Sequence, residues 1–181
     1  MNKLLRTLLS FLRSKRAPKL AITDVGRMRM QVRPSDIDTL GHINNGVYLS
    51  LADLGRYDLL VRSGVWGEFR RRGWYPVVAN ATISYRKSLD LWQRYVLETK
   101  LVGLDDRAVY IEQRFVVDGE VYAVLFLRGR FLKRGGGTVS AAEIAEASGM
   151  APDALPVPDW ITRWAADVAL PSTRQPAPSV W

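Results

Sequence analysis

A polar cluster placed directly ahead of a long, mostly apolar segment is the feature that most constrains how this chain can fold. The cluster holds two carboxylates, the only histidine of the chain and two amides, namely Asp36, Asp38, His42, Asn44 and Asn45. Asp, Asn and Gly favour turns and helix N-caps, because they suit non-helical backbone and the Asp and Asn side chains bind free N–H groups. The residues from Asn45 to Arg62 carry apolar side chains on more than one face. This pattern predicts a helix enclosed by the protein.

The first turn of this helix is expected to face the polar cluster. The free N–H groups at a helix start carry partial positive charge. They can stabilise an oxyanion that develops during a reaction, while a neighbouring carboxylate acts as a base or a nucleophile. The arrangement therefore indicates either a carboxylate-dependent catalytic site or a polar cap on the helix.

The order of these residues resembles a known family. The pattern D-x-D-x-x-G-H-x-N-N-x-x-Y, followed by an acid and an arginine, is similar to the start of hotdog-fold acyl-CoA thioesterases of the 4-hydroxybenzoyl-CoA thioesterase type. It is present here as Asp36, Asp38, Gly41, His42, Asn44, Asn45, Tyr48, Asp53 and Arg56. The resemblance implies an α+β hotdog fold, in which a curved antiparallel sheet wraps a central helix. It also implies a homodimer or a dimer of dimers that hydrolyses acyl-CoA or acyl-carrier-protein thioesters, with no cofactor because coenzyme A is part of the substrate.

The resemblance assigns catalytic roles within the loop. Asp38 matches the carboxylate that attacks the thioester carbonyl or activates a water for that attack, with a helix N-cap as its alternative role. His42 lies where it could orient Asp38, a water or the thioester, or it is a turn residue. The backbone N–H of Asn45 matches the oxyanion position at the helix start. Asp36 is expected to hold the turn.

Further residues of the same pattern are candidates for binding the substrate. The Asn44 amide can bind the carbonyl or the water, and it can also cap the helix. Tyr48 is expected in the core or in the pocket wall. Asp53 shares the catalytic work, since another hotdog branch carries its acid on the central helix, or it pairs with Arg56, which is three residues later.

In this fold, no loop that binds coenzyme A can be recognised from sequence. Arg86 and Lys87 follow an expected strand and are candidates for binding its phosphates, with a solvated strand end as the alternative. Apolar pocket walls from helix and sheet suggest a fatty or aromatic acyl group. A different class of function, a non-catalytic acyl- or lipid-binding protein on the same fold at a membrane surface, stays open because fold does not settle function.

Alternating apolar and polar residues predict strands before and after the central helix in the sequence. One strand is expected over residues 26–33, and four more within 77–133, with Asp118-Gly119 as a tight hairpin turn. Residues 65–76 are expected to form a short helix or loop. A capping box opens a short helix at Ser140, and another helix is expected over 158–170, either docked on the domain or acting as a lid. The residues alone therefore predict an α+β chain with one curved antiparallel sheet.

Composition limits the domain organisation and the chemistry. The chain has 181 residues, 48% of them hydrophobic, which suits one core. We expect an amphipathic helix and linker at 1–19, a hotdog domain at 20–135, and a helical extension with a disordered tail at 136–181. The absence of cysteine excludes disulfides and thiolate chemistry, and a single histidine makes a histidine-rich metal site unexpected. A cytoplasmic location, peripheral to a membrane in one interpretation, agrees with this composition.

The N-terminal segment carries much of the positive charge. Residues 1–16 hold five basic side chains and no acid, and thus +5 of the formal net charge of +8. The body is only mildly basic and shows no nucleic-acid-reading motif. At about 100° per residue the apolar residues of this segment fall on one arc and most polar ones on the other. Residues 3–16 therefore form an amphipathic helix that binds a membrane surface, docks on its own domain or partner, or serves as a transit peptide.

Overall fold

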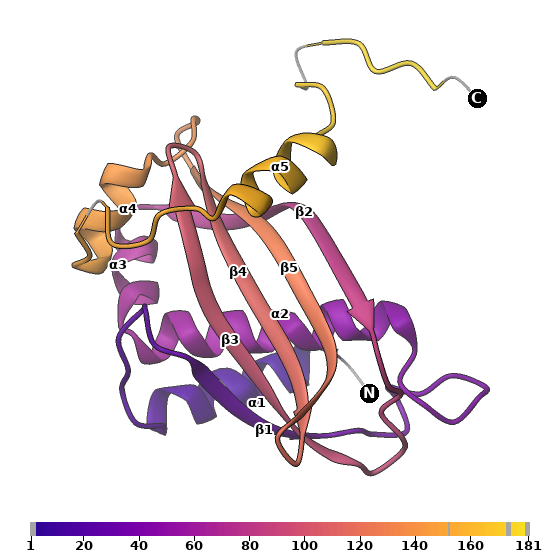
Figure 1. Cartoon of the computed structure of the whole chain (residues 1–181). Helices are drawn as coiled ribbons and strands as arrows, with labels where there is room; N and C mark the ends of the chain where they lie inside the picture. The colour runs from indigo at the N-terminus through magenta and orange to yellow at the C-terminus, as the bar shows by residue number, and fades with distance from the viewer. Residues whose placement is uncertain (1–2, 152, 173–174, 180–181) are drawn as a thin grey trace.

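The computed structural model describes residues 3–151, 153–172 and 175–179. The elements in chain order are α1 (Lys3–Arg16), β1 (Gly26–Gln31), α2 (Asn45–Arg62), α3 (Val65–Arg71), β2 (Trp74–Tyr85), β3 (Arg94–Asp105), β4 (Ala108–Val117), β5 (Glu120–Lys133), α4 (Ala141–Ser148) and α5 (Asp159–Asp167). The strands form one sheet in the order β1-β3-β4-β5-β2, and every neighbouring pair is antiparallel. Figure 1 shows α2 crossing behind the strands of this curved sheet, as the α+β prediction required.

The central helix lies against the sheet because one of its residues has no side chain. A Cβ atom at Gly55 would come within 2.6 Å of Thr99 Oγ1 and 2.9 Å of Gln113 Nε2. Gln113 is fully buried, and its Nε2 donates hydrogen bonds to the Ala52 carbonyl and to Thr99 Oγ1, both at 2.9 Å. Glycine at this position therefore allows α2 to approach β3 and β4 closely enough for a buried amide to join all three elements.

Local sequence signals placed several boundaries correctly. The helix from Asn45 to Arg62 has its expected limits, and the capping box between Ser140 and Glu143 opens α4. Asp118 and Gly119 both have positive φ values, 48° and 83°, as a tight hairpin turn requires.

Other boundaries differ from the prediction. β2 begins at Trp74, earlier than residue 77, because pairing with β5 extends back to Lys133. β3 runs from Arg94 to Asp105, beyond both ends of the segment 95–102 expected from sequence, while β1 ends at Gln31 and α5 at Asp167, earlier than expected. Long antiparallel partners thus extend some strands beyond their alternating segments. Residues 173–174 and 180–181 of the expected disordered tail lie outside the described residues.

The C-terminal helix docks on the sheet. Trp164 Nε1 donates a hydrogen bond to Thr82 Oγ1 at 3.0 Å, and the Trp160 ring meets the Phe126 ring edge-on with centroids 4.6 Å apart. Of the two interpretations of α5, the structure therefore shows docking on the domain. No helix among the described residues is long and apolar enough to cross a bilayer.

The contact at Gly55 generates a stability prediction. We expect Gly55→Ala to destabilise the protein by about 1–3 kcal/mol, because the added methyl group overpacks the junction between α2 and the sheet. Chemical denaturation followed by circular dichroism measures the change. Gly67→Ala in α3 is the matched control, since a Cβ there meets no atom within 4 Å; alanine in an open helical position should leave stability unchanged or raise it by about 0.5–1 kcal/mol. Equal effects of the two substitutions would contradict the close approach.

Candidate active site

The predicted polar residues lie on a tight loop that leads into α2. Isolated β-bridges join Ile37 to Ile43 and His42 to Asp90, and the Asp38 N–H donates to the His42 carbonyl at 3.0 Å. Gly41 turns the loop with a φ of 84°, a backbone conformation that suits glycine. The loop thereby brings the side chains of Asp38 and His42 to the same place.

The two side chains form a partly exposed pair. His42 Nδ1 lies 3.7 Å from Asp38 Oδ2, and the side chains are 29% and 25% exposed. That separation is longer than a hydrogen bond, so the two groups interact through charge when the imidazole is protonated. The other carboxylate oxygen, Oδ1, accepts the Leu40 N–H at 2.9 Å. The carboxylate is thus held by its own loop and remains open to solvent.

The helix is capped by Asn44. Its Oδ1 accepts the Gly46 N–H at 2.9 Å, and its backbone is extended, with φ −62° and ψ 135°. The capping role expected for Asn44 is therefore present, and the alternative role of Asp38 as the N-cap is wrong. Asn45 begins the helix, so no carbonyl of the same helix can accept its N–H.

Asp36 holds the loop from inside the protein. Its carboxylate is buried, accepts the Arg33 N–H at 3.0 Å, and receives Arg6 Nη1 at 2.7 and 2.8 Å on its two oxygens. Its carbonyl accepts the Asn44 N–H at 2.9 Å. The expectation that Asp36 is structural agrees with these contacts. The partner Arg6, on α1, could not be identified from sequence because thirty residues separate the two.

Tyr48 belongs to the core. Its ring meets those of Tyr85 and Phe115 edge-on, with centroids 5.1 and 4.8 Å apart. Burial raises the pKa of Tyr48 to about 12, so the phenol stays neutral at physiological pH. Tyr85, which the sequence analysis did not single out, donates its hydroxyl to the Asn45 carbonyl at 3.0 Å. It therefore ties the end of β2 to the first turn of α2.

The two residues predicted to bind phosphates are already paired with a carboxylate. Arg86 Nη1 and Lys87 Nζ each lie 2.6 Å from the Glu120 carboxylate, and all three side chains are substantially exposed. Their hydrogen bonds lower the pKa of Glu120. A phosphate bound here would compete with Glu120, so the role in binding coenzyme A stays a prediction.

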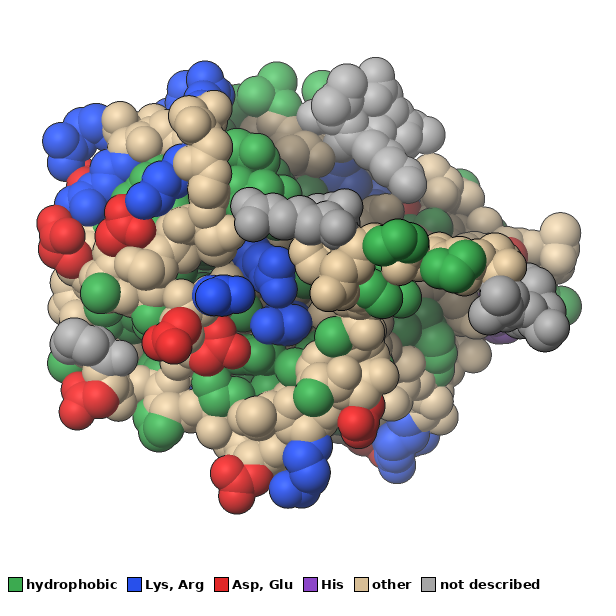
Figure 2. All heavy atoms as spheres, turned by 90° about the horizontal axis from the view of Figure 1, so that it is seen from above, with side chains coloured by type: hydrophobic (Ala, Val, Ile, Leu, Met, Phe, Trp, Pro, Cys, Tyr) green, Lys and Arg blue, Asp and Glu red, His purple; other side chains and the backbone are tan. Residues whose placement is uncertain are grey.

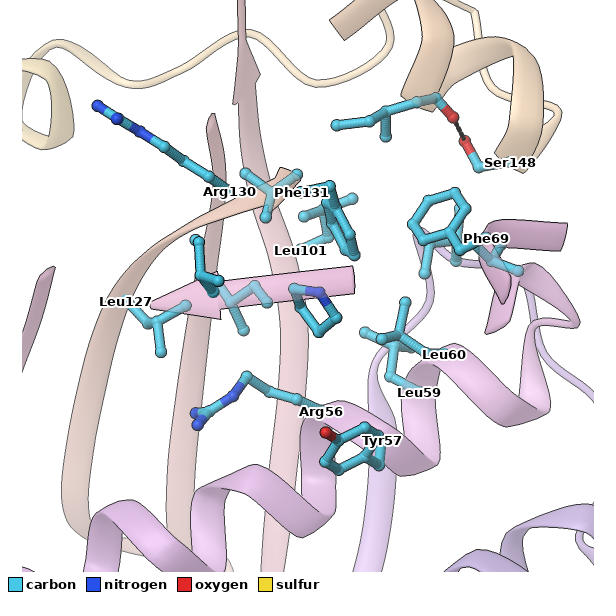
Figure 3. Close-up of a pocket in the computed structure, with 18 of the residues that line it drawn as sticks. Arg56, Tyr57, Leu59, Leu60, Phe69, Leu101, Leu127, Arg130, Phe131 and Ser148 are labelled. Carbon is cyan, nitrogen blue, oxygen red and sulfur yellow. Dashed lines mark hydrogen bonds between the residues drawn. The ribbon is translucent and has the colours of Figure 1, made fainter. Parts of the chain in front are cut away.

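An apolar cavity lies along the second half of α2. Figure 3 shows Phe69, Leu101 and Phe131 gathered around it, with the charged head of Arg130 directed away. The lining comes from α2, α3, β2 to β5 and α4, that is, from segments far apart in sequence, which is why no local pattern could identify it. The end of the molecule that carries α4 and α5 also displays Lys and Arg side chains among hydrophobic ones (Figure 2).

Within the described residues, the chain does not bring the loop and the cavity together. Asp53 is the one predicted site residue that lines the cavity, where it pairs with Arg56. Arg56 also donates to Gln113 Oε1 at 2.6 Å. Asn45 and Asp53 are about 12 Å apart along the helix axis. Asp38, His42, Asn44 and Asn45 thus gather at the helix start, whereas Asp53 belongs to a second region.

Among the residues that the structure describes, no group of three or more His, Cys, Asp or Glu side chains is arranged to hold a metal ion. The polar groups of the loop are instead a carboxylate, an imidazole and a helix N-terminus. Together they can orient a nucleophile or a water and stabilise an oxyanion.

Comparisons with known proteins agree with the fold. A family model described as the thioesterase-like superfamily matches residues 32–165. The YbaW probable thioesterase of Escherichia coli superposes with a TM-score of 0.63 at 22% identity, covering 67% of this chain and 94% of that chain. The predicted hotdog fold is thereby confirmed.

Two curated relatives match part of the chain. Protein THEM6 of Xenopus laevis is 44% identical over 99 residues, which are 54% of this chain and 48% of that protein. The chloroplastic acyl-acyl carrier protein thioesterase ATL2 of Arabidopsis thaliana is 28% identical over 87 residues, which are 48% of this chain and 46% of that protein. The chain thus spans about half the length of the curated relatives it matches.

The ion pair beneath the loop generates a second prediction. We expect Arg6→Ala to destabilise the protein by about 3 kcal/mol, because it leaves the buried Asp36 carboxylate without its charged partner. Arg27→Ala is the control, since Arg27 belongs to an exposed pair with Glu98 and should cost less than about 1 kcal/mol. Urea denaturation of both variants measures the difference, and a cost for Arg6→Ala as small as the control would contradict the assigned role.

Proposed function

Because the chain belongs to the thioesterase-like superfamily, whose family model matches residues 32–165, we propose that it hydrolyses acyl thioesters of coenzyme A or of an acyl carrier protein with Asp38 as its reactive carboxylate. The observation that carries the proposal is the position of that carboxylate. It lies beside His42 at the start of α2 and takes no part in capping the helix.

The loop supplies the groups that thioester hydrolysis needs. In one route the Asp38 carboxylate attacks the thioester carbonyl, the thiolate leaves, and water cleaves the resulting anhydride. In the other, Asp38 accepts a proton from a water that attacks the carbonyl directly. In both routes negative charge develops on the carbonyl oxygen, and the Asn45 N–H at the helix start can stabilise it by about 3 kcal/mol. In this proposal His42, whose Nδ1 lies 3.7 Å from Asp38 Oδ2, orients the carboxylate or the water.

The exposed edge of the sheet supports a homodimer. β2 pairs with β5 on one side only, runs from Trp74 to Tyr85, and leaves Tyr75 and Val78 exposed. A long open edge with exposed apolar side chains favours pairing with another strand. We propose that two copies join through β2 about a two-fold axis and form one continuous sheet.

Such a dimer would also bring the loop of one chain close to the cavity of the other. A two-fold axis at β2 runs the partner's central helix antiparallel to α2. The partner's loop then lies toward the second half of α2, where Asp53, Tyr57 and Phe69 line the cavity. An acyl group in the cavity of one chain could thus present its thioester to the carboxylate of the other. The apolar lining suits a fatty or aromatic acyl group.

The catalytic assignment is tested by substituting the carboxylate. We expect Asp38→Asn to lower turnover by about 100-fold or more, the scale of a principal base or nucleophile. Hydrolysis is measured with short, medium, long and aromatic acyl-CoAs. Asp106→Asn, which changes an exposed carboxylate in the turn after β3, is the control and should retain full activity. Equal turnover in both variants would exclude Asp38 as the reactive carboxylate, and no turnover in the unmodified protein would favour the alternative of a non-catalytic acyl-binding protein.

The dimer is tested by sedimentation equilibrium. We expect twice the chain mass of 20.4 kDa at micromolar concentration. Val78→Lys should shift the protein toward monomer, because a charge on an open edge opposes strand pairing. Leu12→Lys, at an exposed apolar position on α1, should leave the dimer intact. A monomeric unmodified protein would exclude the shared sheet.

A further inference from the structure

The polar face of α1 is turned toward the protein and its leucine face toward solvent. Ser14 is buried, and its hydroxyl donates to Asp58 Oδ1 on α2 at 2.6 Å. Arg6 reaches Asp36 below the active-site loop. On the other side of the helix, four leucines are between 42% and 55% exposed, namely Leu5, Leu8, Leu9 and Leu12.

This orientation is the reverse of the usual one. A helix that only completes a domain places its apolar face on the core and its polar face in water. Here the surface beneath α1 presents the carboxylates Asp36 and Asp58, which require hydrogen-bonding partners. Serine and arginine on α1 supply them, so the leucines remain outside. An apolar stripe of this kind on a folded surface indicates a contact with something else.

Basic side chains border the leucine stripe. At about 100° per residue, Arg13 and Lys15 lie on opposite flanks of it. Leu9 and Leu12 share a shallow hollow with Arg13 and Arg16. Helix α1 itself contains no acid over Lys3–Arg16.

The positive border continues onto the strand beside the helix. A second hollow joins Leu9 and Arg13 to Arg29 on β1 and Arg94 on β3, and none of its lining residues is acidic. Figure 1 shows α1 alongside β1 and below α2. The leucine stripe is therefore an apolar centre within a positively charged surface.

We propose that this face of α1 docks on a phospholipid bilayer that contains anionic lipid. The four leucines would enter the boundary between headgroups and acyl chains, while Arg13, Lys15 and Arg16 contact the headgroups. With 14 residues, the helix is about 21 Å long and lies along the surface. Contact with a second copy of the same face is disfavoured, because it would place two positive borders against each other.

The orientation of α1 also links this face to the site. Arg6 points away from the leucines and holds Asp36, which lies two residues before Asp38. Docking would therefore fix the position and orientation of the Asp38 loop relative to the bilayer surface. The docking itself does not rest on the proposed hydrolysis, and each can fail without the other.

Co-sedimentation of the full chain with vesicles tests the proposal. The unmodified protein should bind vesicles of phosphatidylcholine mixed with phosphatidylglycerol, bind vesicles of phosphatidylcholine alone more weakly, and lose affinity as salt rises. The double variant Leu8→Ser/Leu12→Ser should bind about tenfold or more weakly. Arg13→Gln/Lys15→Gln should lose about fivefold in affinity for each charge removed, on the anionic vesicles only.

Leu170→Ser is the matched control, since Leu170 is an exposed leucine beyond α5, and it should bind as the unmodified protein does. Unchanged thermal unfolding in all variants establishes that they fold, as expected for substitutions at exposed positions. Failure of the unmodified protein to bind either vesicle, or equal binding by the leucine variant, would overturn the proposal. Loss of self-association in the leucine variant without any vesicle binding would assign the face to a protein contact and overturn it as well.

Discussion

The close approach of α2 to the sheet at Gly55 is the constraint on which the rest of the structure depends. The missing side chain lets Gln113 and Thr99 reach the helix backbone, and the fully buried Gln113 amide then bonds to Ala52 and Arg56. An unpaired buried amide would cost about 1–3 kcal/mol. The hydrogen bonds of this amide can all form only when α2 lies at one distance from the sheet and in one rotation about its axis. The buried amide therefore fixes how α2 packs on β3 and β4.

Fixing α2 in this way determines what lies at each of its ends. Its N-terminus meets the loop of Asp38 and His42, where Asn44 caps the helix and Asp36 is held from below. Its second half borders the apolar cavity, with Arg56 joining the buried network to Asp53 at the cavity wall. One rigid helix thus separates the polar chemistry from the apolar volume. In the proposed dimer, a second copy joined at β2 brings the two together.

Signals carried by neighbouring residues were predictable from sequence, and contacts between distant segments were not. The limits of α2, the capping box at Ser140 and the turn at Asp118-Gly119 depend on a few adjacent residues. The choice of Asn44 over Asp38 as the cap depends on how the loop folds back, which several polar side chains in a row leave open. The cavity could not be predicted because its lining residues come from helices and strands that lie far apart in sequence.

The orientation of α1 shows why the pattern of a helix does not determine which face it buries. Rotating the leucines inward would remove Arg6 from buried Asp36, at about 3–5 kcal/mol, and Ser14 from Asp58, at about 1.5–3 kcal/mol for a hydrogen bond to a charged group. Completing the burial of four leucines that are already about half covered would return about 1 kcal/mol each. The polar contacts outweigh the apolar gain, since Asp58 is bonded through Oδ1 to Ser14 and through Oδ2 to Arg62. The carboxylates Asp36 and Asp58 of the domain, and not the pattern of α1 itself, therefore determine that the leucine face is exposed to solvent.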